Sequence, residues 1–248
     1  MATPSKTVLI TGSTRGIGLA FAKHYTQAGW NVIATARANS NTEEVRSPIH
    51  TRHACHGLVV TMDTSDEATV VEAARQLEGV AIDLLVNNAG IGLPGNLHSF
   101  SKASLMREFE VNSVGPLLVT RALLPNLQLA AKTHGSAFVV QLSSFLGSIT
   151  SYTSETAAIF GGNYGYSASK AALNMVTRAL AVDLQTSGVG VVAMHPGYVD
   201  TDMTQGKATL QPADSVAAMA KTVANLKIED TGKFFNLDSN IPVSEIPW

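Results

Sequence analysis

The sequence lacks the features of several classes of protein. It contains a single cysteine, Cys55, so no disulfide bond can form within the chain, and we expect a cytoplasmic location. No apolar run approaches the roughly 20 residues of a membrane span, and the run at residues 8–10 is too short for a signal-peptide core. The formal net charge is -2, with no basic stripe and no acidic block. We therefore expect neither a nucleic-acid nor a membrane partner.

Short apolar runs alternate with longer amphipathic stretches along the whole chain. We predict strands at residues 7–11, 31–36, 58–62, 83–87, 136–142, 189–195 and 232–237. We predict helices at residues 18–29, 65–79, 102–113, 116–133, 163–186 and 212–226, the second with Ser65 or Asp66 as its N-cap. Continuous Val/Ile/Leu runs between helices are typical of a parallel sheet covered on both faces. The sequence therefore predicts an α/β fold, a doubly wound three-layer sandwich forming one domain over residues 1–248.

The first predicted strand runs directly into the glycine-rich turn TGSTRGIG at residues 11–18. In such a turn Gly12 permits the tight bend, Gly16 lets the backbone approach a pyrophosphate, and Gly18 lets the helix pack against the sheet. The start of the following helix offers free N–H groups and a positive dipole end to phosphates. We therefore predict a dinucleotide site formed by Gly12, Ser13, Thr14, Arg15, Gly16, Ile17 and Gly18.

The charges near this turn distinguish between two nicotinamide cofactors. The second predicted strand ends at Ala36 and Arg37, where a site that prefers NAD usually places an acidic residue. Arg15 supplies a second cation at the same end of the sheet. Two guanidinium groups without a carboxylate suit a 2′-phosphate, which predicts NADP(H) rather than NAD(H). The alternative is that Arg37 is a solvated loop charge.

The stretch GGNYGYSASK at residues 161–170 offers two tyrosines to one lysine. On a helix, Tyr166 and Lys170 are four residues apart and share a face, whereas Tyr164 is six residues before Lys170, about 240° around the axis. The ordinary pKa of a tyrosine is about 10, and a nearby ammonium lowers it toward the range of proton transfer. We therefore predict that Tyr166 is an acid tuned by Lys170, and that Tyr164 is an ordinary half-buried aromatic.

The chain also contains NNAG at residues 87–90, Asn112, Ser144 and the pair Pro196-Gly197. With these residues and the motifs above, it resembles the short-chain dehydrogenase/reductase family over essentially its whole length. The segment HPGYVDTDM and the final Trp248 resemble the subgroup of carbonyl reductases of the sniffer and C-factor type. The resemblance implies a Rossmann-like fold with a seven-stranded parallel sheet. It also implies an NADP(H)-dependent reductase of ketones or aldehydes. The alternative is a non-catalytic NADP(H)-binding sensor or signalling protein on the same fold.

The resemblance also implies roles for particular residues. The catalytic set is Asn112, Ser144, Tyr166 and Lys170. Ser144, the second serine of QLSS, binds the substrate oxygen, and Ser143 satisfies the backbone at the strand end. Asn112 holds a water near Lys170, which also holds the nicotinamide ribose. Further implied cofactor contacts are Asp63 at the adenine, the backbone groups of Asn87 and Ala89 at the adenosine ribose, and Val199 and Thr201 at the nicotinamide carboxamide.

The chain departs from the family pattern between Ser144 and Tyr166, which are 22 residues apart and enclose an extra segment at residues 149–162. We expect this segment to form a loop over the substrate entrance. We expect a homodimer or homotetramer, with a monomer as the alternative if the segment alters the oligomer face. A loop at 202–209 with a hinge at Gly206 is a candidate lid. The predicted wall of a pocket for a medium-sized ketone, aldehyde or quinone comprises Leu93, Pro94, Phe145, Ile159, Phe160 and Met203.

A cluster of histidines and one further histidine could suggest metal binding or acid–base catalysis. HTRHACHG places His50, His53, Cys55 and His56 close together, but structural zinc sites usually draw on two separated pairs of ligands, so we predict no metal. His195 precedes Pro196, and we expect it to shape the turn rather than to react.

Overall fold

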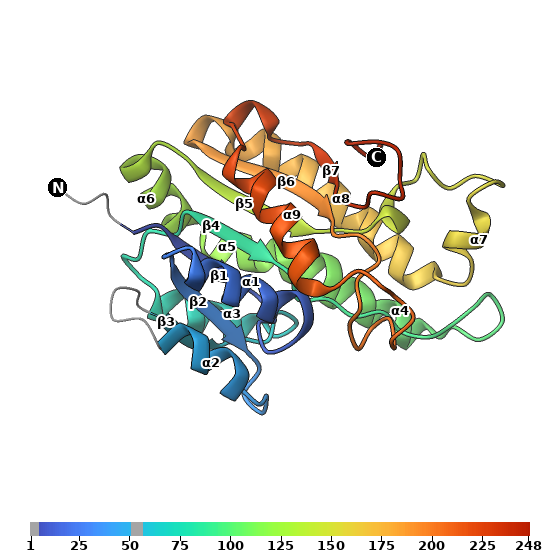
Figure 1. The fold of residues 1–248 in the computed structure, drawn as a ribbon, viewed down its shortest axis with the longest axis horizontal. Helices are drawn as coiled ribbons and strands as arrows, with labels where there is room; N and C mark the ends of the chain where they lie inside the picture. The colour runs from blue at the N-terminus through green and yellow to red at the C-terminus, as the bar shows by residue number, and fades with distance from the viewer. Residues whose placement is uncertain (1–4, 51–56) are drawn as a thin grey trace.

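The computed structural model describes residues 5–50 and 57–248 and contains a seven-stranded, all-parallel sheet between two layers of helices (Figure 1). The strands are β1 (Thr7–Ile10), β2 (Asn31–Ala36), β3 (Gly57–Thr61), β4 (Leu84–Asn87), β5 (Ala137–Leu142), β6 (Val189–His195) and β7 (Phe234–Asn236). Their order across the sheet is β3-β2-β1-β4-β5-β6-β7. The predicted α/β fold is confirmed. The strand order reverses between β1 and β4, and open α/β sheets bind their ligands at the carboxyl ends of the strands beside such a reversal.

The helices connect successive strands and cover both faces of the sheet. They are α1 (Gly16–Gln27), α2 (Glu43–His50), α3 (Glu67–Gln76), α4 (Lys102–Phe109), α5 (Gly115–Ala122), α6 (Leu124–His134), α7 (Ala157–Phe160), α8 (Tyr164–Leu184) and α9 (Pro212–Ala224). Shorter helical turns are η1 (Glu110–Val114), η2 (Phe145–Gly147), η3 (Gln185–Ser187) and η4 (Ile228–Asp230). The core on one face joins the sheet to α3, α5, α6 and α8, and the core on the other joins it to α1, α2 and α9.

The two cores explain why the strands are continuous apolar runs. Along β1, Leu9 belongs to the core beneath α3 and α5, whereas Val8 and Ile10 belong to the core beneath α1 and α9. All three side chains are fully buried. Because successive side chains of a strand point to opposite faces, a sheet covered on both sides needs an apolar residue at every position.

Apart from the four-residue α7 in the extra segment, which was expected to be a loop, the α-helices differ from the predicted ones in two places. Helix α2 was not predicted, and its Val45 and Ile49, four residues apart, are buried against the sheet. Polar neighbours in EEVR conceal this short apolar face. The two helices predicted between 102 and 133 are instead four segments, with a π-helical turn at η1 and a proline near the start of α5 and of α6. Asp66 caps α3 by accepting a hydrogen bond from the Ala68 N–H at 3.0 Å.

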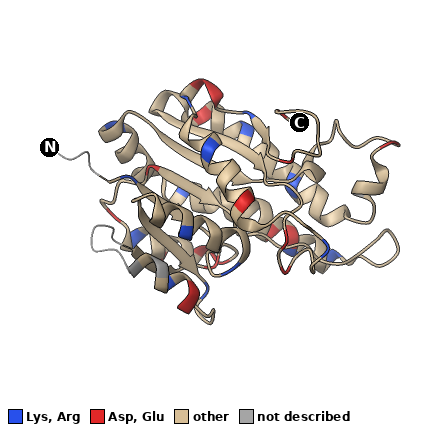
Figure 2. Ribbon diagram, viewed as in Figure 1, with Lys and Arg blue, Asp and Glu red and all other residues tan. Residues whose placement is uncertain are grey.

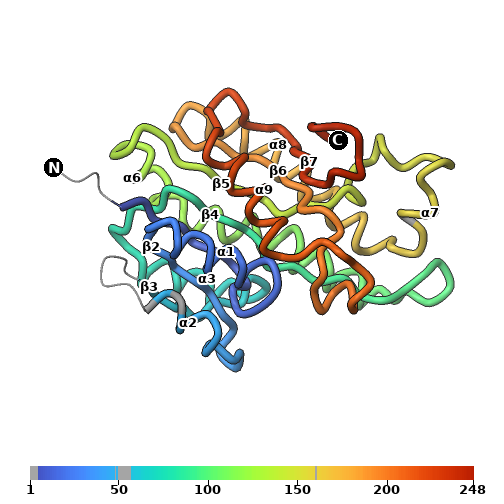
Figure 3. The backbone as a smooth tube through the Cα atoms, in the orientation of Figure 1, coloured from blue at the N-terminus to red at the C-terminus, as the bar shows by residue number. Residues whose placement is uncertain are grey.

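The loop after β4, the extra segment at residues 149–162 and the C-terminal segment are distant in sequence. They lie at the same end of the molecule, beyond the carboxyl ends of the strands (Figure 3). A Cβ placed on Gly162 would lie 3.6 Å from the Gly95 carbonyl oxygen, so the extra segment contacts the loop after β4. Thr150, at the other end of the extra segment, donates hydrogen bonds from its amide and hydroxyl to the Trp248 carbonyl oxygen, at 3.1 and 2.7 Å. The extra segment is therefore held at both ends.

Lys and Arg are scattered among Asp and Glu over the ribbon of Figure 2. Among the described residues, no helix combines the length and apolar character that crossing a membrane requires. The side chain of His50 and all of His53, Cys55 and His56 lie outside the described residues. The described part of the chain holds no cluster of three or more His, Cys, Asp or Glu suited to a metal ion.

The close approach of α1 to the first turn generates a prediction about stability. A Cβ placed on Gly18 would lie 2.2 Å from the Gly12 carbonyl oxygen, which is backbone and cannot rotate away. We expect Gly18→Ala to reduce the free energy of unfolding by about 1–3 kcal/mol, as overpacking does elsewhere. Urea unfolding followed by circular dichroism measures this. Gly95→Ala is the control, because its Cβ would meet nothing closer than 3.4 Å; equal stability of the two variants would contradict the prediction.

Candidate active site

The glycine-rich turn has the shape of an anion cradle. Gly12 and Gly16 adopt left-handed backbone conformations, with φ of +67° and +53°, which side chains rarely tolerate. Helix α1 begins at Gly16 with no side chain capping it and no acidic residue in its first turn. The first N–H groups of a helix have no intrahelical partner and lie at the positive end of the dipole. The residues present therefore fit a phosphate group.

Buried side chains fix the turn from beneath. The Ser13 hydroxyl donates to the Ile10 carbonyl oxygen at 2.7 Å and accepts from the Thr35 N–H at 3.2 Å, so it joins the turn to β2. Thr14 and Ile17 are partly buried in the same turn. The hydroxyl of Ser13 thus already has hydrogen-bond partners within the protein. That Ser13 contacts the cofactor stays a prediction, and its backbone would make the contact.

The loop after β4 is tied to the same turn. The Thr11 hydroxyl accepts hydrogen bonds from the N–H groups of Asn88 and Ala89, at 2.9 and 3.0 Å. The Asn88 side chain returns a bond to the Thr11 carbonyl oxygen at 2.8 Å. Asn88 was not predicted, although its place in NNAG was the available signal. The side chain of Asn87 points to the opposite side and donates to the Thr120 hydroxyl at 3.1 Å.

The two predicted phosphate-binding arginines are both exposed. Arg15 directs its Nε to a carboxylate oxygen of Asp202 at 3.3 Å, in a pair whose two side chains are mostly in solvent. An exposed ion pair of this kind contributes little free energy and is readily exchanged for another anion. Arg37, after β2, is close enough to Asp63 for its charge to act on that carboxylate.

Asp63 lies at the end of β3, where an adenine contact was predicted. Burial acts to raise the pKa of its carboxyl, but hydrogen bonds from Ser65 and the charges of Arg107 and Arg37 outweigh burial and lower that pKa. The Ser65 hydroxyl and amide reach one carboxylate oxygen at 2.6 and 3.0 Å. Asp63 is therefore ionised at neutral pH, and part of its bonding capacity is already used.

The loop after β6 approaches the glycine turn from the other side. A Cβ placed on Gly16 would lie 3.3 Å from the Thr201 methyl group, so these two predicted cofactor residues are neighbours. Val199 is buried, and its carbonyl oxygen accepts a bond from the Thr204 hydroxyl at 2.9 Å. The predicted cofactor residues thus gather at the carboxyl ends of β1, β4 and β6.

Three of the four predicted catalytic residues, Ser144, Tyr166 and Lys170, meet between β5 and α8. The hydroxyl of Ser144 is close enough to that of Tyr166 to act on the pKa of the phenol. The Lys170 ammonium lies 5.7 Å from the centre of the Tyr166 ring and donates a hydrogen bond to the Leu142 carbonyl oxygen at 2.7 Å. Gly147 makes room for this arrangement, because a Cβ on it would lie 2.9 Å from the Lys170 backbone. The hydroxyl of Ser143 instead bonds Asn174 at 2.6 Å.

We expected Lys170 to lower the pKa of Tyr166, but that pKa is raised in the structure. Burial raises the pKa of Tyr166 to about 12, the hydrogen bond with Ser144 acts in the opposite direction, and the charge of Glu108 raises it further. Burial also lowers the pKa of Lys170 to about 8. At pH values where the phenol would ionise, Lys170 is therefore mostly neutral in this structure and offers the phenolate no charge.

Asn112 lies in the π-helical turn η1, which explains how an asparagine occupies the middle of a helical stretch. It is fully buried, and its side chain accepts a bond from the Ile91 N–H at 2.9 Å and donates to the Ile91 carbonyl oxygen at 2.8 Å. It also donates to the Ser169 hydroxyl at 3.0 Å. Asn112 thus fixes the loop after β4 against α8, and the predicted water beside Lys170 stays a prediction.

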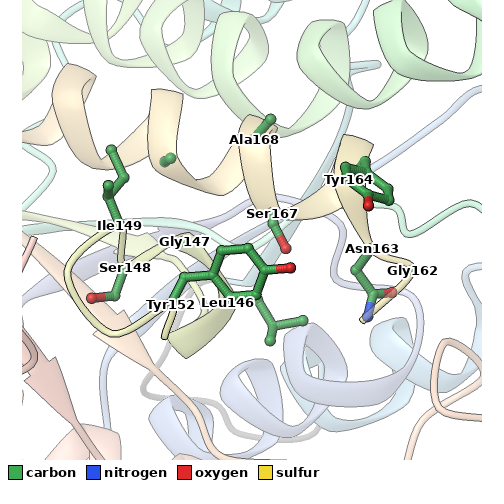
Figure 4. Close-up of a pocket in the computed structure, with 11 residues that line it drawn as sticks. Leu146, Gly147, Ser148, Ile149, Tyr152, Gly162, Asn163, Tyr164, Ser167 and Ala168 are labelled. Carbon is green, nitrogen blue, oxygen red and sulfur yellow. The ribbon is translucent and has the colours of Figure 1, made fainter. Parts of the chain in front are cut away.

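The extra segment encloses a cavity of about 230 Å³ on the outer side of α8 (Figure 4). Helix α8 contributes the side chains of Tyr164, Ser167, Ala168 and Ala171, and the extra segment contributes Ile149 and Tyr152 among others. None of the four predicted catalytic residues lines this cavity. Tyr164 therefore lies on a different face from Tyr166, as helix geometry predicted.

The predicted pocket wall is only partly assembled. Gly92 lies beside the Tyr166 ring and Met203, since a Cβ on it would be 3.5 Å from the ring and 3.6 Å from the Met203 sulfur. Met203 is half-exposed, and its loop turns at Gly206 with φ of +71°. Phe145 packs instead against the small buried cluster of Ala193, Phe234 and Ile246. Ile159 is exposed, and the side chain of Phe160 lies outside the described residues.

Known proteins share the sequence pattern and the fold of this chain. Residues 6–211 match the family described as short chain dehydrogenase. The chain belongs to the short-chain dehydrogenase family. This family of oxidoreductases was the one that the motifs resembled.

Individual members of the family cover most or all of the chain. The C-signal of Myxococcus xanthus is 39% identical over 168 residues, which are 67% of this chain and 93% of that protein. The NADPH-bound carbonyl reductase from chicken fatty liver superposes with a TM-score of 0.84 at 30% identity, covering 99% of this chain and 100% of that one. The carbonyl reductase Sniffer of D. melanogaster gives a TM-score of 0.86 at 28% identity, with the same coverage. The resemblance to sniffer-type reductases is therefore confirmed.

The burial of Lys170 generates a prediction about pH and stability. Its pKa in the folded protein is about 8, against an ordinary value of 10.5. The folded chain therefore loses this proton before the unfolded chain does, and the stability rises between these two pH values. From pH 7.5 to 9.5 we expect the native protein to gain about 2 kcal/mol relative to Lys170→Met, as measured by urea unfolding. Lys221→Met, on the exposed side of α9, is the control and should follow the native protein.

Proposed function

We propose that this chain is one catalytic domain, an NADP(H)-dependent reductase of ketones or aldehydes. The observation that carries the proposal is the meeting of the Ser144 and Tyr166 hydroxyls one helical turn from the buried Lys170 ammonium. The similarity to a carbonyl reductase crystallised with NADPH supports the choice of reaction and of cofactor.

The residues at the carboxyl ends of the strands suit such a cofactor. The turn from Gly12 to Gly18 holds the pyrophosphate, and Arg15 and Arg37 hold the 2′-phosphate. Asp63, Asn87 and Ala89 line the adenosine, and Val199 and Thr201 line the carboxamide. When bound, the nicotinamide of NADPH supplies the hydride that the carbonyl carbon accepts.

The side chains around Tyr166 supply the remaining proton. A carbonyl oxygen placed against Ser144 and Tyr166 accepts hydrogen bonds from both hydroxyls as negative charge develops. Tyr166 then gives its proton to that oxygen, which yields the alcohol and leaves a phenolate. At pH below about 8, Lys170 is charged and stabilises this phenolate. Asn112 keeps the neighbouring loop in place and holds the water of the proposed proton relay.

The wall of the site suggests an apolar substrate of medium size. Met203 and Leu93 are partly exposed beside Gly92, next to Tyr166. The loop that carries Met203 is attached to Arg15 through Asp202. We propose that this loop closes over a ketone, aldehyde or quinone once the cofactor is bound.

A second copy of the chain is the partner that the surface favours. The outer sides of α4, η1 and α8 expose Met106, Val114, Met175 and Val182, the last two about 70% and 72% exposed. Contiguous apolar side chains on neighbouring helices are typical of an interface. Ala171 is the last residue of α8 that lines the cavity beside the extra segment. We propose a homodimer through this face, and light scattering of the purified protein distinguishes it from a tetramer or a monomer.

A second candidate function is signalling without turnover. The observation that favours it is the 39% identity to a protein named C-signal. A protein of this kind would bind NADPH yet reduce nothing in a broad panel of ketones and aldehydes. The reductase would oxidise NADPH in the presence of at least one compound of that panel.

The two tyrosines of the opening of α8 provide a matched test of the reaction. We expect Tyr166→Phe to lower kcat by about 10²–10⁴-fold, because the general acid is lost. NADPH binding, followed by the fluorescence of the nicotinamide, should be retained. Tyr164→Phe removes the same hydroxyl from another face of the helix and should leave kcat unchanged. A fully active Tyr166→Phe enzyme would rule out the proposed mechanism.

The charge argument provides a test of the cofactor. We expect Arg37→Ala to weaken NADPH binding by about 10- to 100-fold, the value of a hydrogen bond to a charged group, with NADH binding unchanged. Arg46→Ala is the control, because Arg46 lies on the nearby α2 and donates only to Thr42 among the described contacts. Equal losses for NADPH and NADH would show that Arg37 does not bind the 2′-phosphate.

A further inference from the structure

A buried carboxylate lies beside Tyr166 and has no place in the mechanism above. Glu108, the penultimate residue of α4, is 3% exposed, and burial raises the pKa of its carboxyl. It takes part in none of the ion pairs found among the described residues. A buried carboxylate without a cation is costly, so the surrounding contacts must account for its presence.

Glu108 holds the loop after β4 by its backbone. One carboxylate oxygen, Oε1, accepts a hydrogen bond from the Leu93 N–H at 2.9 Å. Asn112, four residues later on the same helical face, holds the amide and carbonyl of Ile91. Between these two anchors lies Gly92, where an added Cβ would lie 3.5 Å from the Tyr166 ring. The two side chains therefore position the strip of backbone that covers the tyrosine.

The other carboxylate oxygen faces the start of α8. A Cβ placed on Gly165 would lie 1.9 Å from Glu108 Oε2, so only a glycine admits the carboxylate here. Gly165 immediately precedes Tyr166, and the charge of Glu108 acts on the phenol. The adjoining cavity, lined by Ser104 and Asn163 among others, measures about 10 Å³, room for about one water molecule. A substrate does not fit there, so Glu108 acts through its neighbours.

We propose that Glu108 is a positioning residue for Tyr166, which fixes the loop at residues 91–93 against the ring and places a negative charge beside the phenol. The titratable groups that face it from α8 are Tyr166 and Tyr164, and Arg107 on its own helix is paired with Glu110. The kinetic part of this inference rests on the proposed reductase function, and the structural part does not.

Two substitutions separate the hydrogen bond from the charge. Glu108→Gln keeps an oxygen for the Leu93 N–H and removes the charge, whereas Glu108→Ala removes both. Because the charge raises the pKa of Tyr166, its removal lowers that pKa. In the reduction direction Tyr166 must be protonated, so the part of the loss of kcat/KM at high pH that comes from ionisation of Tyr166 should begin at a lower pH in Glu108→Gln. Glu110→Gln, an exposed carboxylate two residues away, should leave the pH profile unchanged.

Hydrogen exchange tests the positioning without turnover. We expect the amides of residues 91–93 to lose protection by about tenfold or more in Glu108→Ala and to keep it in Glu108→Gln. Native protection in Glu108→Ala would overturn the proposal, as would an unchanged pH profile of an active Glu108→Gln enzyme. If the native protein shows no reductase activity, the proposed function fails, while the exchange experiment still decides whether Glu108 fixes the loop.

Discussion

The hydrogen bond from the Lys170 ammonium to the Leu142 carbonyl oxygen connects the long helix α8 to the carboxyl end of β5. It fixes the height of α8 along the sheet and hence the position of Tyr166, one turn earlier. Ser144 follows β5 by two residues, so the same contact sets the distance between its hydroxyl and that of Tyr166. In this position the ammonium is buried and loses its hydration. Burial disfavours the charged form and therefore lowers the pKa of Lys170.

The loop after β4 depends on side chains from three elements, since it has no regular structure of its own. In its first half, Thr11 holds Asn88, Asn112 holds Ile91 and Glu108 holds Leu93. Each of these side chains is buried and hydrogen-bonds backbone groups, which would otherwise be unsatisfied. The loop can therefore lie across Tyr166 without a helix or a strand to stiffen it.

Much of the fold was predictable because each strand of a sheet covered on both faces is a short continuous apolar run. The amphipathic helical stretches of the chain do not show this pattern. Among the described side chains of the missed helix α2, Val45 and Ile49 alone belong to the core, too few for a recognisable period. The pairing of Tyr166 with Lys170 followed from helix geometry alone. Glu108 was missed because a glutamate in a polar helix reads as a surface residue until its neighbours are known. The raised pKa of Tyr166 was likewise missed, because sequence spacing indicates the nearby lysine but not the burial of both groups.

The sequence by itself determined the parallel sheet, the glycine turn at the start of α1 and the shared face of Tyr166 and Lys170. These features depend on residues close together in the chain, where periodicity and backbone conformation decide the outcome. Only the tertiary structure decided that Asn112 lies in a π-helical turn, that the extra segment packs on the outer side of α8, and that Glu108 is buried against Gly165. These features depend on which distant segments exclude water from one another, and solvation at such contacts is not encoded in any local pattern.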